Sequence, residues 1–283
     1  MSILSRASVQ DRKRLLNLLP VANLREVFES KKAKKEDICE AEAEKTGTAQ
    51  MKRIAEFVDT YLGCCKQHVY VFSHDGSPKL PDNIVDGEKV LDADGSHALY
   101  LSRAKYTVVL RNPLEEETLE FLWPISVELR HSADKDYLLV RFVVLEKNVS
   151  SYFDRPAYIA SRSIKEETVL AGIAGDLLAA DLNKGIKKLW HDGYIECTRS
   201  RFKKKYSMSS EMMDEEKGIK EYYPELYEIM RKSPLYTTLF DVIEDGNSID
   251  SFSADPTHGI IGFSSYSEKG DTDAILAKII SNN

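Results

Sequence analysis

The spacing of apolar residues changes near residue 65, and this change favours a mixed α and β fold. From Ser8 to about Gly63 the apolar residues recur every three or four positions, which is typical of amphipathic helices. From Lys66 to about Asn148 they alternate, and Asp-Gly pairs separate the alternating runs, which is typical of strands joined by tight turns. We therefore predict an α+β protein with a small N-terminal helical domain and a central antiparallel sheet.

Three helices are predicted in the N-terminal region. Ser8 and Asp11 have the spacing of a capping box, and Pro20 ends the helix that follows them. The next two helices are predicted over residues 22–32 and 50–62, since each has one apolar face.

The central region carries five alternating segments, and the last two flank a polar connection of hairpin length at residues 132–136. We expect this hairpin to form within an antiparallel sheet. The predicted strands are residues 68–73, 97–101, 106–111, 126–130 and 137–145.

The C-terminal region is acidic. From Glu211 to Asn283 there are six Lys or Arg and fifteen Asp or Glu residues, so its charge is 6 − 15 = −9, against −7 for the whole chain. An anion-binding surface is therefore expected upstream of Glu211. Helices are predicted near residues 224–231 and over 271–280, with strands at 236–243 and 260–264.

Between these regions, residues 181–209 combine a two-faced helix with a basic hairpin. Leu182, Ile186 and Leu189 recur at helical spacing, while four basic side chains follow the same spacing on another face. Gly193 stands where the helix is expected to stop. Strands are then predicted at residues 194–198 and 205–208, joined by a basic tip at 199–204.

This order of helix, glycine stop and charged hairpin resembles the recognition helix and wing of winged helix-turn-helix proteins, over roughly residues 167–209. Residues 168–178 would be the preceding helix of the motif. The resemblance implies duplex DNA as partner, with cations on phosphates and with Asn183 and Lys187 reaching base edges. The expected nucleic-acid-binding residues are Asn183, Lys184, Lys187, Lys188, Arg199, Arg201, Lys203, Lys204 and Lys205.

A different interpretation of the same residues stays open. Residues 169–190 can be drawn as one unbroken amphipathic helix that packs on the central sheet, with the basic tip as an ordinary solvated loop.

If the winged-helix interpretation holds, the chain has four regions. They are a helical domain at 1–65, an antiparallel β region at 66–149, a winged-helix-like DNA-binding segment at 150–210 and an acidic α/β region at 211–283.

The overall order of a helical N-terminal domain, a sheet and a helix leading into a basic strand is also similar to the centromere protein N family. The segments LLPVANLREVF and YIECTRSRFKKKYS carry this similarity. That family binds nucleosomal DNA and protein together. It therefore implies a second hypothesis, an adaptor or assembly subunit that binds a protein partner or a second copy of itself through apolar helices.

The sequence contains no motif that identifies a catalytic residue, a cofactor site or a metal ligand. Its six histidines and four cysteines lack metal-ligand spacing, and phosphate-binding loops and nucleophile-elbow patterns are absent. A nucleic-acid-processing enzyme with an unrecognised site stays as a third hypothesis. Because no apolar run is long enough to cross a membrane, we expect a cytoplasmic protein, or a nuclear one in a eukaryote, with reduced and buried cysteines.

Overall fold

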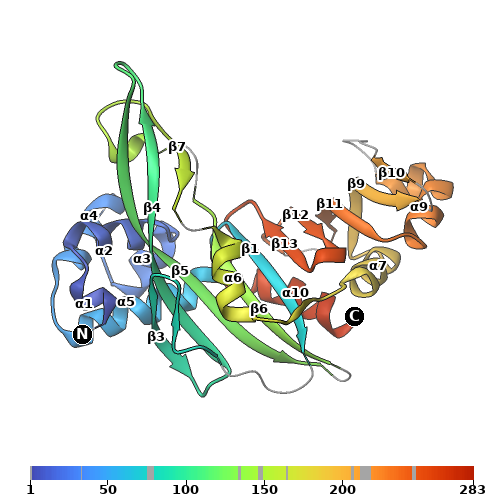
Figure 1. The fold of residues 1–283 in the computed structure, drawn as a ribbon, viewed down its shortest axis with the longest axis horizontal. Coiled ribbons are helices and arrows are strands. Elements are labelled where there is room, and N and C mark those ends of the chain that lie inside the picture. Colours follow the sequence, from blue (N-terminus) through green and yellow to red (C-terminus); the bar gives the residue numbers. More distant parts are fainter. Residues whose placement is uncertain are drawn as a thin grey trace. The chain divides into compact units, whose positions relative to one another are not determined.

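The computed structural model describes residues 2–32, 34–74, 80–132, 135–145, 149–163, 165–204, 207–210, 218–243 and 247–283 (Figure 1). For residues 151, 201–204 and 207–210 it describes the backbone only. The chain forms two units, each assembled from three segments, whereas the four predicted regions are consecutive. Unit 1 comprises Met1–Leu62, Lys79–Glu128 and Phe142–Asp176, and unit 2 comprises Gly63–Pro78, Leu129–Arg141 and Leu177–Asn283.

Helix α2 (Val9–Asn17) begins where its local signal predicts. Ser8 Oγ accepts a hydrogen bond from the Asp11 backbone at 3.0 Å, and the Asp11 carboxylate accepts one from the Ser8 backbone, so the capping box is confirmed. The helices are α1 (Ile3–Arg6), α2 (Val9–Asn17), α3 (Val21–Val27), α4 (Lys35–Glu44), α5 (Thr48–Tyr61) and α6 (Glu166–Ala174), with a 3-10 turn η2 (Ser150–Tyr152).

The strands of unit 1 follow the order β2–β3–β4–β5, and β7 pairs with part of β4. The two strands predicted at 97–101 and 106–111 form one strand, because the intervening polar residues continue the pairing with β5 from Ser102↔Trp123 to Lys105↔Glu120. The strands are β2 (Asn83–Ile84), β3 (Gly87–Ala93), β4 (His97–Leu110), β5 (Glu115–His131), whose last three residues belong to unit 2, and β7 (Ala157–Arg162).

The strands of unit 2 follow the order β10–β9–β11–β12–β13–β1–β6, and β8 pairs with β1. They are β1 (Gln67–His74), β6 (Asp136–Val143), whose last two residues belong to unit 1, β8 (Leu178–Ala179), β9 (Ile195–Lys204), β10 (Ser207–Ser210), β11 (Leu235–Val242), β12 (Ser251–Asp255) and β13 (Ile260–Phe263). The helices are α7 (Asn183–Asp192), α8 (Ile219–Tyr222), α9 (Pro224–Arg231) and α10 (Asp271–Ser281), with two 3-10 turns, η1 (Leu62–Cys64), whose first residue belongs to unit 1, and η3 (Pro256–His258).

The core of unit 2 lies between one face of its strands and the helices α7 and α10. Ile186 and Trp190 of α7 are fully buried in the same cluster as Phe240 and Phe252 of the strands. Gly185 lets α7 approach α10, because a Cβ atom there would lie 2.1 Å from the carbonyl oxygen of Ile279.

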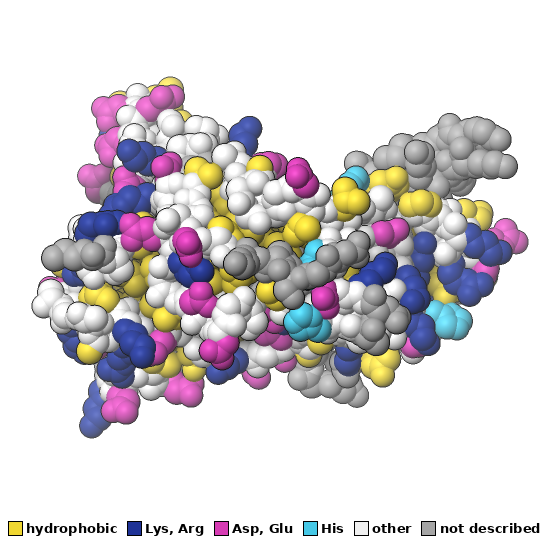
Figure 2. Space-filling model, turned by 60° about the horizontal axis from the view of Figure 1, so that its bottom comes forward, with side chains coloured by type: hydrophobic (Ala, Val, Ile, Leu, Met, Phe, Trp, Pro, Cys, Tyr) yellow, Lys and Arg dark blue, Asp and Glu magenta, His cyan; other side chains and the backbone are white. Residues whose placement is uncertain are grey.

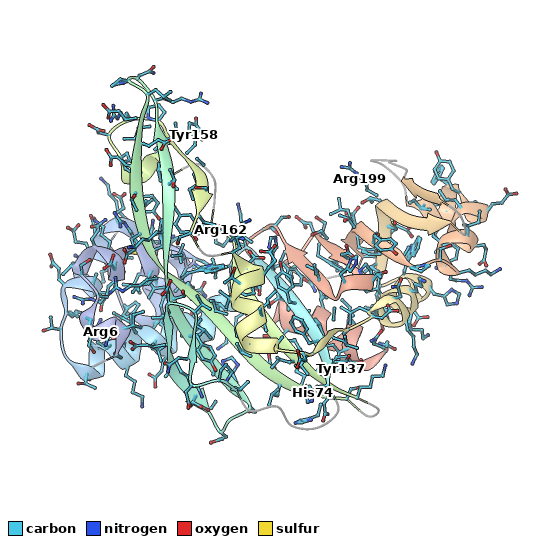
Figure 3. All side chains as sticks on the ribbon, viewed as in Figure 1. Arg6, His74, Tyr137, Tyr158, Arg162 and Arg199 are labelled. Atoms are coloured by element: carbon cyan, nitrogen blue, oxygen red, sulfur yellow. The ribbon has the colours of Figure 1, made fainter. Side chains whose placement is uncertain are left out.

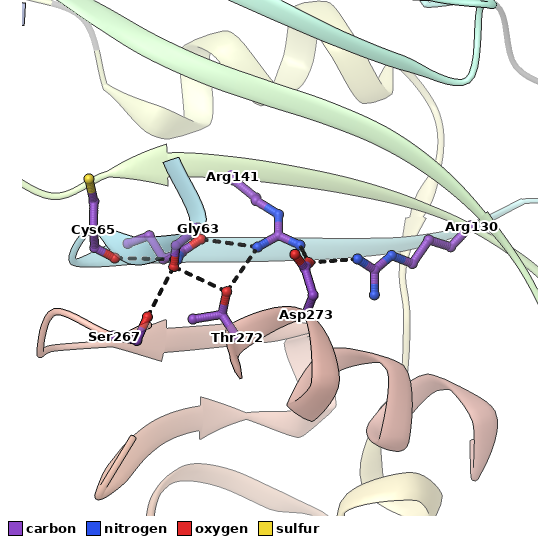
Figure 4. Close-up of polar contacts among 8 residues, drawn as sticks. Gly63, Cys65, Arg130, Arg141, Ser267, Thr272 and Asp273 are labelled. Atoms are coloured by element: carbon purple, nitrogen blue, oxygen red, sulfur yellow. Dashed lines mark hydrogen bonds and ion pairs between the residues drawn. The ribbon is translucent and has the colours of Figure 1, made fainter. Parts of the chain in front are cut away.

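The start of α10 is fixed by polar contacts to β5, β6 and η1 within unit 2 (Figure 4). Asp273 pairs with the buried guanidinium of Arg141 and accepts a hydrogen bond from Arg130 at 2.8 Å. Thr272 Oγ1 donates to the carbonyl oxygen of Gly63 at 3.1 Å. In the described part of the chain, no helix is both long and apolar enough to cross a membrane.

The winged helix-turn-helix arrangement is not confirmed. Helix α6 ends at Ala174, before Gly175 with its φ of 56°, and β8 then pairs with β1 before α7 begins. The unbroken helix over 169–190 is therefore wrong, and the two helices of the expected motif belong to different units. The predicted basic tip at 199–204 is also wrong, because these residues continue β9, where Phe202 pairs with Leu235 of β11.

Candidate nucleic-acid interface

Helix α7 has the two faces that its sequence predicts. Leu182, Ile186 and Leu189 are buried, so the opposite side of the helix faces solvent and carries the exposed Lys184 and Lys188. The helix stops at Gly193, which adopts the left-handed conformation with φ of 82° and donates its backbone N–H to the end of α7. The predicted exposure is therefore confirmed for Lys184 and Lys188, whereas Lys187 is only partly exposed.

Asn183 does not belong to this exposed face. Its side chain is 8% exposed, and its Nδ2 donates to Asp181 at 2.7 Å and to Thr257 at 3.2 Å. Its Oδ1 accepts a hydrogen bond from the Leu235 backbone at 2.8 Å. The expected contact of Asn183 with base edges is therefore wrong, because both ends of the amide are already satisfied within unit 2.

Lys187 is half-buried and holds α7 against the end of α9. Its Nζ donates to the carbonyl oxygen of Ser233 at 2.8 Å. Burial lowers the pKa of Lys187, although the nearby charge of Asp181 acts in the opposite direction. The ammonium group of Lys187 thus joins α7 to the end of α9, and the residue is only partly exposed to solvent.

This contact brings the lysines of α7 beside two further cations, Arg231 and Lys232, at the end of α9. Figure 2 shows Lys and Arg side chains gathered over these two helices. We call the exposed residues Lys184, Lys188, Arg231 and Lys232 the α7–α9 cationic surface.

Two carboxylates partly neutralise the α7–α9 cationic surface. Lys188 pairs with Asp192 at 2.6 Å, while Arg231 and Lys232 pair with Glu228 at 3.1 and 3.8 Å. Lys184 has no ion pair with any residue that the structure describes. Exposed pairs of this kind are weak.

Arg199 lies on the other face of the strands. Its neighbour Ser200 is buried, and Ser200 Oγ lies 2.8 Å from Thr238 Oγ1 on the core side. Arg199 is exposed, and Leu239, its cross-strand partner in β11, is also exposed. Because α7 covers the core side, Arg199 projects away from that helix (Figure 3). A single patch formed by Arg199 and the α7 lysines is therefore not present.

The rest of the predicted basic tip is described only in part. Arg201, Lys203 and Lys204 lie in β9, but their side chains are outside the described part of the chain, and Lys205 is outside it altogether. Sequence reasoning missed Arg231 and Lys232. Basic residues are common at the C-terminus of a helix because they interact favourably with the helix dipole, so their presence there does not indicate an anion-binding site.

Among the residues that the structure describes, no group of three or more His, Cys, Asp or Glu side chains is placed to hold a metal ion. The chain matches no family model, no curated protein and no solved structure.

Proposed function

We propose that this chain is a non-catalytic DNA-binding protein whose α7–α9 cationic surface contacts backbone phosphates. The hydrogen bond from Lys187 to Ser233 carries the proposal, because it fixes the lysines of α7 beside Arg231 and Lys232. Several cations held on two joined helices suit a polymer with one negative charge per nucleotide, since each contact releases a condensed counterion.

The expected binding depends little on sequence. Phosphate contacts set the position of a protein on DNA, whereas side chains that reach base edges set its specificity. Asn183 is engaged inside unit 2, and the amine of Lys187 is engaged by Ser233, so neither is free to read a base. The α7–α9 cationic surface therefore offers charged groups that contact the phosphates of the DNA backbone and do not distinguish between bases.

The test compares the affinity of a fluorescent DNA duplex for wild type and two variants at one salt concentration. The first variant combines Lys184→Gln, Lys188→Gln and Lys232→Gln, and the matched control is Arg199→Gln on the opposite face of the strands. We expect the triple variant to bind at least tenfold more weakly and the control to bind like wild type. Equal binding by the triple variant and wild type would reject the proposal, as would a loss confined to the Arg199 variant.

A second candidate function is an adaptor that binds a protein, and exposed apolar side chains on α8 and α9 favour it. Tyr222, Tyr223 and Ile229 are 39%, 38% and 43% exposed. Isolated apolar residues are common on surfaces, whereas a group on adjoining helices suits a protein partner. Stoichiometric co-purification of a partner that the Ile229→Glu variant loses, without DNA binding at physiological salt, would favour this function over the first.

A further inference from the structure

Unit 1 contains a polar cavity of about 130 Å³ between α2, α4 and η2. Four of its lining residues, Gln10, Lys13, Arg14 and Asn17, come from α2. Their spacing of three, four and seven positions places them along one stripe of the helix. Glu36 and Cys39 of α4 and Tyr152 of η2 complete the wall.

Arg14 is held in place at this cavity but keeps a donor without a partner. Its guanidinium lies 5.8 Å from the ring centroids of both Phe121 and Tyr152, and Nη1 donates to the carbonyl oxygen of Glu120 at 2.9 Å. Its Nε is buried and makes no hydrogen bond to any described residue. Because this nitrogen is out of reach of solvent, it does not itself contact a ligand, and Arg14 contributes the positive charge of its guanidinium to the cavity that it lines.

Two lysines add positive charge at the same place. Lys13 lines the cavity and pairs with Glu40 at 3.4 Å, while Lys35 Nζ donates to the carbonyl oxygen of Asn17 at 2.6 Å. Glu36 is the carboxylate in the wall. With Lys13 and Arg14 against Glu36, the formal charge of the lining side chains is 2 − 1 = +1.

The thiol in the wall is not a nucleophile. Burial raises the pKa of Cys39 to about 11, although the charges of Lys35 and Lys13 act against this rise. The thiol is therefore protonated at neutral pH, and thiolate chemistry needs the deprotonated form. The cavity is accordingly suited to binding and unsuited to covalent catalysis by Cys39.

We infer that this cavity binds a small oxyanion, the phosphate or carboxylate group of a low-molecular-weight ligand. The guanidinium of Arg14 supplies a positive charge held in place by Glu120 and two aromatic rings, and Lys13 supplies a second positive charge in the same wall. A volume of about 130 Å³ is sufficient for the anionic group itself, since a cavity of about 150 Å³ in another protein holds one benzene molecule. Glu36 is placed to accept a hydrogen bond from a hydroxyl or amine of the same ligand.

The test measures the melting temperature of the full chain as sodium phosphate or sodium acetate replaces chloride at constant ionic strength. A ligand that binds the folded state raises the melting temperature in a saturable way, from which an apparent Kd follows. The variants are Arg14→Gln and Lys13→Gln, and the matched control is Lys52→Gln, which removes an exposed lysine of α5 that pairs with Glu56 at 3.5 Å. Lys13→Gln removes a surface pair, so it keeps the test valid if Arg14→Gln fails to fold.

We expect wild type and the Lys52 variant to respond alike, and the Lys13 and Arg14 variants to show an apparent Kd at least tenfold higher. A response to phosphate alone identifies a phosphate site, and a response to acetate identifies a carboxylate site. The inference is overturned if neither anion gives a saturable rise. It is also overturned if all four proteins rise equally, because phosphate stabilises folded proteins generally by exclusion from their surface.

Discussion

Lys187 in α7 donates a hydrogen bond from Nζ to the carbonyl oxygen of Ser233, 2.8 Å away and two residues beyond the end of α9. The sequence assigns Lys187 to a DNA-reading face, yet the structure uses its amine to join two helices. This contact contributes to the arrangement of the α7–α9 cationic surface, together with the packing of Trp190 of α7 against Tyr227 of α9. The residue is therefore a positioning residue for the proposed DNA contact.

Replacing Lys187 with Met tests this role, because Met keeps an unbranched apolar stem but cannot donate to Ser233. We expect the free energy of unfolding to fall by about 1 kcal/mol, the usual net value of one hydrogen bond. The measurement is urea unfolding at neutral pH. Lys184→Met is the matched control on the same helix, and its effect should stay within about 0.5 kcal/mol because that side chain is exposed. Equal losses in the two variants would contradict the assigned role.

Two helical glycines should respond in opposite ways to replacement by Ala. A Cβ atom at Gly185 would meet the carbonyl oxygen of Ile279 at 2.1 Å, whereas a Cβ atom at Gly172 would lie 3.9 Å from Cγ2 of Val85. We expect Gly172→Ala to stabilise the chain by about 0.5–1 kcal/mol through helix propensity. We expect Gly185→Ala to destabilise it by about 1–3 kcal/mol through overpacking. Thermal unfolding checks both, and a stabilising Gly185→Ala would show that α7 and α10 are not in close contact.

The sequence predicts those elements whose signals are local. The capping box at Ser8 and the stop at Gly193 lie within a few residues of the helix ends that they determine. The helix predicted near residues 224–231 is found as α9 at those bounds, with Pro224 in its first turn. The mixed α and β class likewise follows from the change in apolar spacing near residue 65.

The placement of the candidate site depends on partners far along the chain, which local spacing does not contain. Arg199 belongs to a strand because β11, about forty residues later, continues the pairing, and the predicted turn at this position therefore does not form. Asn183 is buried because Leu235 and Thr257 bind its amide. A basic run in the sequence thus identifies charge, but the long-range contacts decide which charges share a face.

Asp273 should make the free energy of unfolding depend on pH in the acidic range. Burial alone would raise its pKa, but the charges of Arg141 and Arg130 and their hydrogen bonds outweigh this effect and lower the pKa below the ordinary value of 3.8. A carboxyl group with a lowered pKa in the folded state stabilises the protein above 3.8. This contribution is lost as the pH falls through the folded-state pKa.

We therefore expect Asp273→Asn to destabilise the chain at neutral pH by roughly 1 kcal/mol, a modest value because half of the Asp273 side chain is exposed and water screens the pair. The difference from wild type should shrink as the pH falls below 3.8. Urea unfolding across this range measures it, with Glu56→Gln as a control for an exposed pair on α5. A difference that does not change with pH would contradict the assignment of Asp273 as the titrating group.

The cysteines should react slowly while the chain is folded. All four are buried thiols, as the sequence analysis predicts, and burial raises the pKa of Cys39 and of Cys64 to about 11. Compared with a thiol of the ordinary pKa of 9.0, each holds about 100-fold less thiolate at neutral pH. We expect a thiol-reactive dye to label all four in denaturant and none rapidly without it. Rapid labelling of the folded chain would contradict the burial of these side chains.

The salt dependence of duplex binding tests the proposed DNA contact most directly. Each phosphate contact contributes about 0.9 to the slope of log affinity against log salt concentration. The account predicts that the combined Lys184→Gln, Lys188→Gln and Lys232→Gln variant has a slope shallower than wild type by about 2–3, while Arg199→Gln keeps the wild-type slope. A triple variant with the wild-type slope would contradict the account.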